Sequence, residues 1–256
     1  MDTILKDLSS FCKVPNDSQT QLKMLTRLKD LLDSLRKAEK KKITEIQSKI
    51  EDTLADIVIQ SRAPNDIIVR YIYYIYKHIF DFGLSSHIGD FINKYSSLLH
   101  SKTSHNVKGT ALWLCGKVCT KAEYKTPNMT ELIKAIMKYI KSTSDLGMKH
   151  ICFGVVSRLL MLKLPFFHTL IPDILKMILK QEKYLTNSKK NIIKALNATI
   201  FYLNPQTVEK NYPSLIDIIV KCFDDEDEKV RNIAMQTYIS LHTDKVFDNN
   251  IQKNKI

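Results

Sequence analysis

Five basic residues recur along this sequence at an almost constant spacing. They are separated by 38, 41, 41 and 41 residues, and they are Arg70, Lys108, Lys149, Lys190 and Arg231. A residue able to cap a helix stands four positions before each of them: Asp66, Ser104, Asp145, Thr186 and Asp227. An apolar residue stands ten positions after each: Phe80, Val118, Leu159, Ile200 and Leu241. The chain is therefore built of repeated units, and each unit contains a capped helix.

The repeat predicts the fold class. A fixed period of about 40–47 residues with two helices per unit is typical of a HEAT or armadillo array, in which each unit packs mainly on its neighbours. Glycine and proline are scarce, with 6 and 7 among 256 residues, which disfavours a fold of many strands and tight turns. We therefore predict an all-α solenoid of HEAT-like helical hairpins, an armadillo-like superhelix whose surface binds other macromolecules.

Helical periodicity and proline positions divide the chain into three regions. Residues 1–42 are predicted to hold two N-terminal helices and a basic linker, and residues 43–243 to hold five helical pairs. The second helix of each pair should start at one of the five caps. Pro172 and Pro213 each fall inside the predicted first helix of a pair, and we expect them to kink those helices. The polar residues 244–256 are predicted to be a disordered tail.

The basic residues allow two interpretations. They could form a structural ladder by reaching acidic groups in their own or the adjoining unit, or they could form a row that binds a ligand. The net charge is +12, but 33 of the 39 basic residues are lysine. Arginine is better suited to bidentate phosphate recognition, so we expect no specific nucleic-acid binding. A basic segment could contact anionic membrane or be a solvated linker: Arg36, Lys37, Lys40, Lys41 and Lys42.

Aromatic residues cluster in the first of the five capped helices. Most of this cluster is expected in the core between helices, while one face of it could form a groove for a partner. The candidate groove residues are Tyr71, Tyr73, Tyr74 and Tyr76.

The sequence contains no recognisable catalytic set and no cofactor motif. Cys115 and Cys119 lie four residues apart, but apolar residues surround them and no second pair exists, so buried thiols are expected instead of a metal site. The histidines form no spaced motif, and no phosphate-binding loop is present. We expect a non-catalytic protein without a cofactor or metal. The cysteine pattern and the lack of a visible signal peptide favour the cytoplasm.

Two segments, DIIVRYIYYIYKHI and DEKVRNIAMQTYISL, resemble HEAT repeats, whose second helix often opens with an acidic residue before Val-Arg. Over residues 18–243 the order of elements also resembles the N-terminal part of a family of very large HEAT-repeat proteins. These proteins accompany the clathrin adaptor of the trans-Golgi network and endosomes. The similar segments are LKMLTRLKDLLDSL, IEDTLADIVIQSRAPNDIIVRYI and VKGTALWLCGKVCTKAE, the last with Lys108, Ala111, Cys115 and Gly116.

The resemblance implies a scaffold or adaptor in vesicle traffic between Golgi, endosomes and plasma membrane. Its partners would be clathrin-adaptor subunits, and it would lie peripherally on Golgi or endosomal membranes. The repeat pattern alone leaves a second class open, namely a HEAT-type adaptor in nuclear transport, microtubule binding or a chromatin complex.

Overall fold

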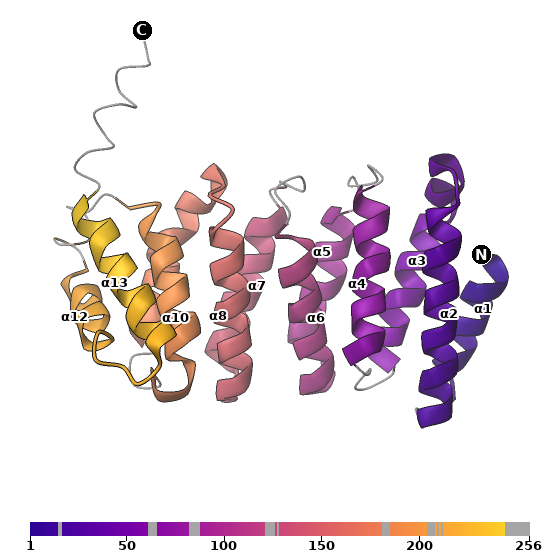
Figure 1. Cartoon of the computed structure of the whole chain (residues 1–256), viewed down its shortest axis with the longest axis horizontal. Helices are drawn as coiled ribbons and strands as arrows, with labels where there is room; N and C mark the ends of the chain where they lie inside the picture. Colours follow the sequence, from indigo (N-terminus) through magenta and orange to yellow (C-terminus); the bar gives the residue numbers. More distant parts are fainter. Residues whose placement is uncertain are drawn as a thin grey trace, which may run out of the picture. The chain divides into compact units, whose positions relative to one another are not determined.

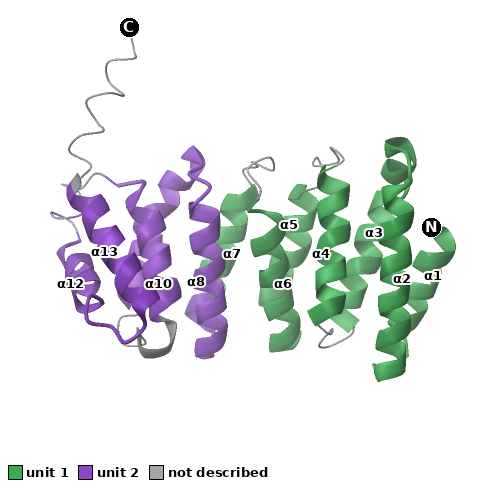
Figure 2. Ribbon diagram, viewed as in Figure 1, with its two compact units in different colours: residues 1–139 green, residues 140–256 purple. Residues whose placement is uncertain are grey.

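In a computed structural model of the chain, helices joined by turns and short irregular segments make up the residues that it describes. These residues are 1–14, 17–60, 66–81, 88–120, 126, 128–180, 185–203, 208, 210 and 212–243. No strand occurs among them, which confirms the all-α prediction. The chain divides into two compact units, residues 1–139 and 140–256 (Figure 2). The predicted tail at 244–256 lies outside the described residues.

The first unit consists of two layers of helices (Figure 1). Three helices pack side by side in the front layer: α2 (Ser18–Arg36), α4 (Asp66–Asp81) and α6 (His105–Val118). The helices behind them are α1 (Asp2–Phe11), α3 (Lys40–Gln60), α5 (Ile88–Ser97) with the short 3-10 helix η2 (Leu98–His100), and α7 (Asn128–Ser142), which runs across the boundary between the units. Each front helix packs on the helix that precedes it in the chain, as expected of helical hairpins.

The second unit repeats this arrangement. Its front layer is formed by α8 (Leu146–Leu160), α10 (Leu185–Ile200) and α13 (Glu228–Thr243). The 3-10 helix η4 (Pro165–Leu170) leads into α9 (Ile171–Lys180), which packs on α10, and α12 (Pro213–Lys221) packs on α13.

The apolar positions of the repeat form the core. Phe80, Val118, Leu159, Ile200 and Leu241 are all buried. Removing an aliphatic or aromatic side chain of this size from water contributes about 1.5–3 kcal/mol. The recurrence of one buried residue in each front helix explains why the period is visible in the sequence.

The N-terminal helices belong to the array, which differs from the predicted separation at residue 42. Helix α1 packs on α2 and α3, and α2 packs on α4, so these helices form a further hairpin. The predicted basic linker is also shorter, because α2 ends at Arg36 and α3 begins at Lys40. Lysine is a good helix former and no proline or glycine intervenes, so Lys40, Lys41 and Lys42 form the first turn of α3.

Two prolines start helices and do not kink them. Pro213 is the first residue of α12, and Pro172 is the second residue of α9. The first N–H groups of a helix have no partner within it, so proline costs little at these positions. Each proline therefore lies in the first turn of an α-helix, although it was expected inside one: Pro172 closely follows the 3-10 helix η4, and Pro213 opens α12.

A close approach joins α8 to α10. The Asn191 amide donates a hydrogen bond of 2.8 Å to the backbone carbonyl oxygen of His150. A Cβ atom at Gly154 would lie 2.8 Å from the Asn191 Nδ2 atom, which is closer than Cβ atoms normally come to other atoms. Glycine at position 154 therefore leaves the space in which the Asn191 side chain lies.

Candidate functional site

Three of the predicted capping residues lie immediately before their helices. Ser104 Oγ accepts a hydrogen bond of 3.4 Å from the Val107 N–H, and Asp145 Oδ1 accepts one of 2.9 Å from the Met148 N–H. Asp227 Oδ1 accepts a bond of 2.8 Å from the Lys229 N–H at the start of α13. These side chains satisfy backbone donors that have no partner within the helix.

The other two predicted caps lie inside their helices. Helix α4 begins at Asp66 itself, and α10 begins at Leu185, so Thr186 is its second residue. Asp66 still suits its position, because a carboxylate in the first turn faces the positive end of the helix dipole. The N-cap assignment does not hold for Thr186, since the helix starts one residue before it.

The five basic residues do not form one uniform ladder. Lys190 Nζ lies 3.9 Å from Asp227 Oδ2, and the ammonium of Lys108 lies 5.2 Å from the ring centroid of Tyr139. Arg231, expected to meet acidic side chains, donates instead to two backbone carbonyl oxygens, those of Asp225 at 2.7 Å and Glu226 at 3.0 Å.

The remaining two residues of the column lie on different units. Arg70 is exposed on α4 and forms no ion pair with any residue that the structure describes, and Lys149 lies half-buried in the first turn of α8. The repeat therefore fixes the position of each basic residue on its helix, while the local neighbours decide its partner.

The acidic loop before α13, residues 224–227, contacts the N-terminal part of α10. Lys189 Nζ lies 2.7 Å from Asp225 Oδ2. The hydrogen bond from Lys189 lowers the pKa of the Asp225 carboxyl, and the same bond raises the pKa of Lys189. This ion pair was missed by the sequence argument because Lys189 stands one position before the basic column.

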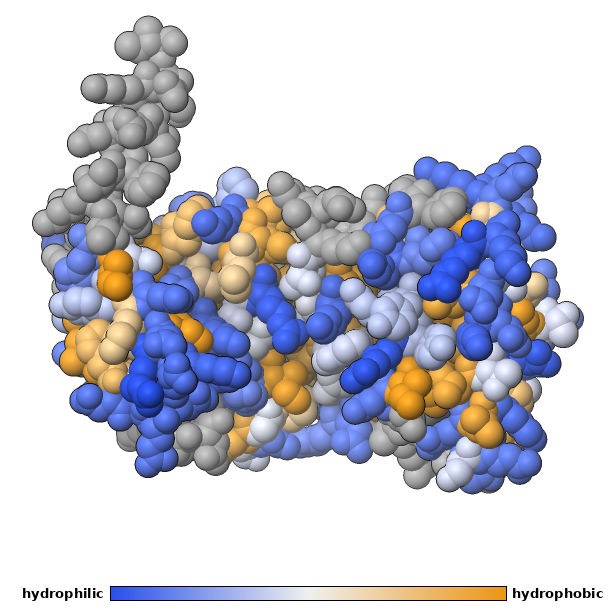
Figure 3. Space-filling view, in the orientation of Figure 1, coloured by the Kyte–Doolittle hydropathy of each residue, from blue (hydrophilic) through white to orange (hydrophobic). Residues whose placement is uncertain are grey.

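A second group of cations lies on the front layer of the second unit, and we call Arg158, Lys190, Lys194 and Lys229 the basic surface. They come from α8, α10 and α13, and hydrophilic residues cover the lower part of α10 and α13 in Figure 3. Burial lowers the pKa of Lys194, and the charges of Lys190, Arg158 and Lys229 lower it further. The pKa of His150 is lowered by burial and by Lys190 and Lys194.

Exposed aromatic residues lie on the front layer of the first unit. Ile67, Tyr71 and Tyr74 follow each other by four and three residues along α4, and Ile67 and Tyr74 are 49% and 47% exposed. The Tyr74 ring centroid lies 6.4 Å from that of Tyr71 and 5.4 Å from that of Tyr73. The Tyr73 ring meets Trp113 of α6 at 5.9 Å. We call the surface formed by these five residues the aromatic surface: Ile67, Tyr71, Tyr73, Tyr74 and Trp113.

Tyr76 does not belong to this surface, although the sequence placed it in the candidate groove. Its side chain is 1% exposed, and its hydroxyl donates a 3.3 Å hydrogen bond to the backbone carbonyl oxygen of Glu51. It also meets the Tyr95 hydroxyl at 3.2 Å. Tyr76 therefore faces the helices behind α4, because it lies on the opposite side of α4 from Tyr74.

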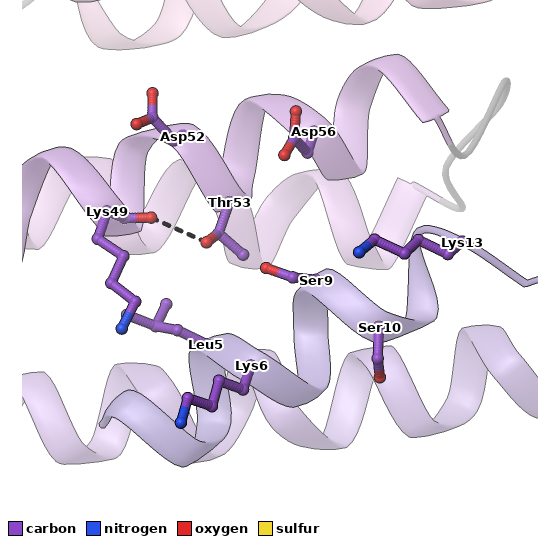
Figure 4. A pocket seen from close by; sticks show the side chains of 9 residues that line it. All are labelled: Leu5, Lys6, Ser9, Ser10, Lys13, Lys49, Asp52, Thr53 and Asp56. Carbon is purple, nitrogen blue, oxygen red and sulfur yellow. Dashed lines mark hydrogen bonds between the residues drawn. The ribbon is translucent and has the colours of Figure 1, made fainter.

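An open cleft of about 620 Å³ lies between α1 and α3 (Figure 4). Eight of the nine residues that line it are polar or charged, among them Lys6, Lys13, Asp52 and Asp56. Asp52 forms an ion pair with Lys94, and the Thr53 hydroxyl donates 2.8 Å to the carbonyl oxygen of Lys49. These contacts are those of a solvated helix surface, and the lining shows no nucleophile beside a general base.

The cysteines lie in environments that disfavour the thiolate. Cys115 and Cys119 are buried in α6 and at its end, and burial raises the pKa of Cys115 to about 12. Cys152 is buried in α8, where burial raises its pKa to about 12. The thiolate is the form that binds metal and attacks substrates, so none of these three cysteines is suited to these roles at neutral pH.

No group of three or more potential metal-binding side chains occurs among the described residues. Within the same ranges, no helix combines the length and the apolar character needed to cross a bilayer.

The basic segment is exposed at all five of its cations: Arg36, Lys37, Lys40, Lys41 and Lys42.

Comparison with solved structures identifies the fold. A designed armadillo repeat protein has 13% identical residues and a TM-score of 0.56, with 93% of this chain and 98% of that chain covered. An engineered protein has 12% identity and a TM-score of 0.57, with 93% and 97% covered. A designed armadillo repeat protein in complex with the peptide (KR)4 has 12% identity and a TM-score of 0.52, with 93% and 98% covered.

At these identities the comparison establishes an armadillo-like α-solenoid and nothing about activity. No protein-family model matches the chain, and no curated protein has a significantly similar sequence. The fold is one that these neighbours use as a repeat scaffold, and it agrees with the period of the basic column.

Proposed function

We propose that the protein is a non-catalytic scaffold that binds a segment of a partner protein on the aromatic surface. The observation that carries this proposal is the exposure of Tyr74 and Ile67 beside Tyr71 on one face of α4. Aromatic side chains are enriched at protein interfaces, because they bury a large area while losing little conformational freedom.

Contacts among its own residues hold part of the aromatic surface in place. Tyr73 packs against Trp113, and the ammonium of Lys117 lies 5.8 Å from the Trp113 ring centroid. The Tyr74 ring lies against those of Tyr71 and Tyr73. These contacts restrict the rings before a partner arrives, which reduces the entropy lost on binding.

The partner segment is expected to present apolar side chains to α4 and α6. Aromatic surfaces of this kind favour extended peptides, including proline-rich ones, because such peptides also lose little entropy on binding. The structural neighbour that carries a peptide supports the general idea that an armadillo-like array can hold one. Its peptide does not define the sequence that this chain would bind.

We further propose a role in clathrin-adaptor-linked vesicle traffic between Golgi, endosomes and plasma membrane. This part rests on the order of sequence elements over residues 18–243, which resembles the large HEAT-repeat family described above. The exposed basic segment, from Arg36 to Lys42, would contribute a weak contact with anionic lipid in the cytoplasm, at about 1 kcal/mol for each charge near the surface.

Affinity purification of the tagged chain tests the scaffold and its setting together. The wild type should recover clathrin-adaptor subunits and appear on punctate membranes. The double variant Ile67→Ala/Tyr74→Ala should lose those subunits while keeping its fold. Leu22→Ala is the matched control, since Leu22 is 65% exposed on α2 and lies outside the aromatic surface.

Other recoveries would change the proposal. Exclusive recovery of nuclear-transport cargo, tubulin or chromatin components would favour the second class of adaptor. Equal recovery with the wild type and the double variant would show that the aromatic surface is not the binding site.

A further inference from the structure

The basic surface of the second unit concentrates positive charge from three neighbouring helices. Arg158 lies near the end of α8, Lys190 and Lys194 lie one turn apart on α10, and Lys229 lies in the first turn of α13. Arg158 and Lys229 are exposed, and the two lysines of α10 are half-buried. Helix α10 packs on both α8 and α13, and the charges of the other three cations each lower the pKa of Lys194.

Five acidic residues, 224–228, precede Lys229 in the chain, and one of them acts on Lys194. That residue is Asp227, which favours the charged form of Lys194. Its carboxylate already caps α13 through the Lys229 N–H, and it lies 3.9 Å from Lys190. Asp225 is engaged by Lys189 at 2.7 Å. Three cations and one carboxylate therefore act on Lys194, and an anionic ligand would neutralise the excess positive charge around it.

We propose that the basic surface binds an extended acidic peptide segment of a partner protein. The proposal goes beyond the aromatic surface, because it concerns other residues in the other compact unit. Carboxylate side chains of the peptide would approach Lys194 and Arg158, where no ion pair is formed with the residues that the structure describes.

The geometry of the front layer suits an extended chain. Packed helices lie about 8–10 Å apart, so the distance from α8 to α13 across α10 is about 16–20 Å. An extended peptide rises about 3.3 Å per residue, so about six residues would cross the three helices. Acidic residues at every second or third position would then face one cation after another.

The extent of the surface favours a peptide over a nucleic acid. Guanidinium and ammonium groups both bind carboxylates as well as phosphates, so the type of cation does not separate the two ligands. The further arginine of this region, Arg231, already donates to two backbone carbonyl oxygens. A group of four cations across three helices matches a short acidic segment better than a long polyanion.

Fluorescence anisotropy with the full chain tests this proposal. The probe is a labelled peptide of about eight alternating aspartate and glutamate residues, and its control is the matching peptide of asparagine and glutamine. We expect the acidic peptide to bind and the neutral one not to bind. Raising the salt concentration from about 50 mM to about 200 mM should weaken binding several-fold.

Charge reversal locates the site. Lys190→Glu/Lys194→Glu should weaken peptide binding at least about tenfold. Lys23→Glu/Lys29→Glu makes the same change in net charge at two exposed lysines of α2, and we expect less than about a twofold effect from it. Because Lys190 and Lys194 are half-buried, the milder Lys194→Gln/Lys229→Gln variant should also weaken binding, and circular dichroism must show both variants folded.

Three results would overturn the proposal. The first is that the acidic peptide does not bind even at low salt. The second is that both charge reversals weaken peptide binding equally, which would indicate an effect of net charge alone. The third is that a DNA duplex or anionic vesicle binds more tightly than the peptide and loses its binding only in Lys190→Glu/Lys194→Glu. That outcome would assign the surface to a different class of ligand.

Discussion

Lys189 of α10 and Asp225 of the loop before α13 form an ion pair of 2.7 Å that joins two consecutive front helices of the second unit. Asp225 also accepts the Asp227 N–H at 3.0 Å, so one carboxylate holds the loop and the neighbouring helix together. The loop is further held by Arg231, which donates to its carbonyl oxygens.

The first prediction concerns the pH dependence of this pair. Its contribution to stability is present above the ordinary Asp pKa of 3.8 and is lost as the pH falls through the lowered pKa of Asp225. The raised pKa of Lys189 means that the contribution is present below 10.5 and is lost as the pH rises through that raised value. Asp225→Asn should therefore lower the free energy of unfolding at neutral pH, and with it the melting temperature. The loss should be less than about 1 kcal/mol, because Lys189 is partly exposed.

Thermal unfolding followed by circular dichroism checks this prediction. The difference between wild type and Asp225→Asn should shrink when the pH falls below about 3.8. Lys134→Gln, which breaks an exposed pair between residues three apart on α7, is the control and should have little effect. A difference that stays constant down to strongly acidic pH would contradict the assignment.

The second prediction concerns the cap of α8. Asp145→Ala removes the acceptor of the Met148 N–H and should cost about 1 kcal/mol. Glu45→Ala, at an exposed position inside α3, is the control and should change stability by less than about 0.5 kcal/mol. Chemical denaturation measures both, and an unchanged midpoint for Asp145→Ala would show that the cap contributes nothing.

The third prediction concerns the approach of α8 and α10. Gly154→Ala should destabilise the protein by about 1–3 kcal/mol, because the new Cβ would meet Asn191 Nδ2 at 2.8 Å. Asn191→Ala should also destabilise it, because the hydrogen bond to the His150 carbonyl is lost.

A double-mutant cycle separates these effects. The added methyl group no longer meets an amide in Gly154→Ala/Asn191→Ala, so the double variant should be destabilised by less than the sum of the single variants. Strict additivity, measured by denaturant unfolding, would mean that the two positions do not interact.

The fourth prediction concerns thiol reactivity. Cys12 is half-buried, and its pKa is raised to about 11 by burial and by Asp56, whereas Cys115, Cys119, Cys152 and Cys222 are buried. We expect Cys12 to react first and slowly with a thiol reagent at pH near 8, and the others to react only on unfolding. Mass spectrometry of the labelled protein identifies the site, and rapid labelling of Cys115 in the folded chain would contradict the structure.

The repeat made much of the fold predictable. Spacing placed Ser104, Asp145 and Asp227 immediately before their helices and placed Phe80 and Leu159 in the core. Such features are local, because a cap bonds N–H groups two or three residues ahead and a buried stripe follows the helical period. The same pattern missed the first hairpin, because Asp17 caps α2 but lies 49 residues before Asp66, and Gln21 stands at the basic position.

Candidate site residues were predicted less well than the helices. Tyr71, Tyr73 and Tyr74 lie together on the aromatic surface, yet Tyr76 lies in the core, although all four fall within six consecutive positions. Trp113, Lys194 and Arg158 were not predicted from the sequence to be binding residues. Their roles depend on which residues of the neighbouring helix they meet, and those residues lie tens of positions away in the chain.

The sequence by itself determined the class of fold, most of the helices and the apolar residues of the front helices that form the core. These follow from periodicity, capping and proline chemistry, which act within a few residues. Only the tertiary structure decided which side of α4 is exposed, that Arg231 binds backbone carbonyls, and that Lys189 meets Asp225. The physical reason is that exposed charges and rings contact residues of neighbouring helices. Those residues lie far away in the chain, and a helical period does not predict which of them come close in space.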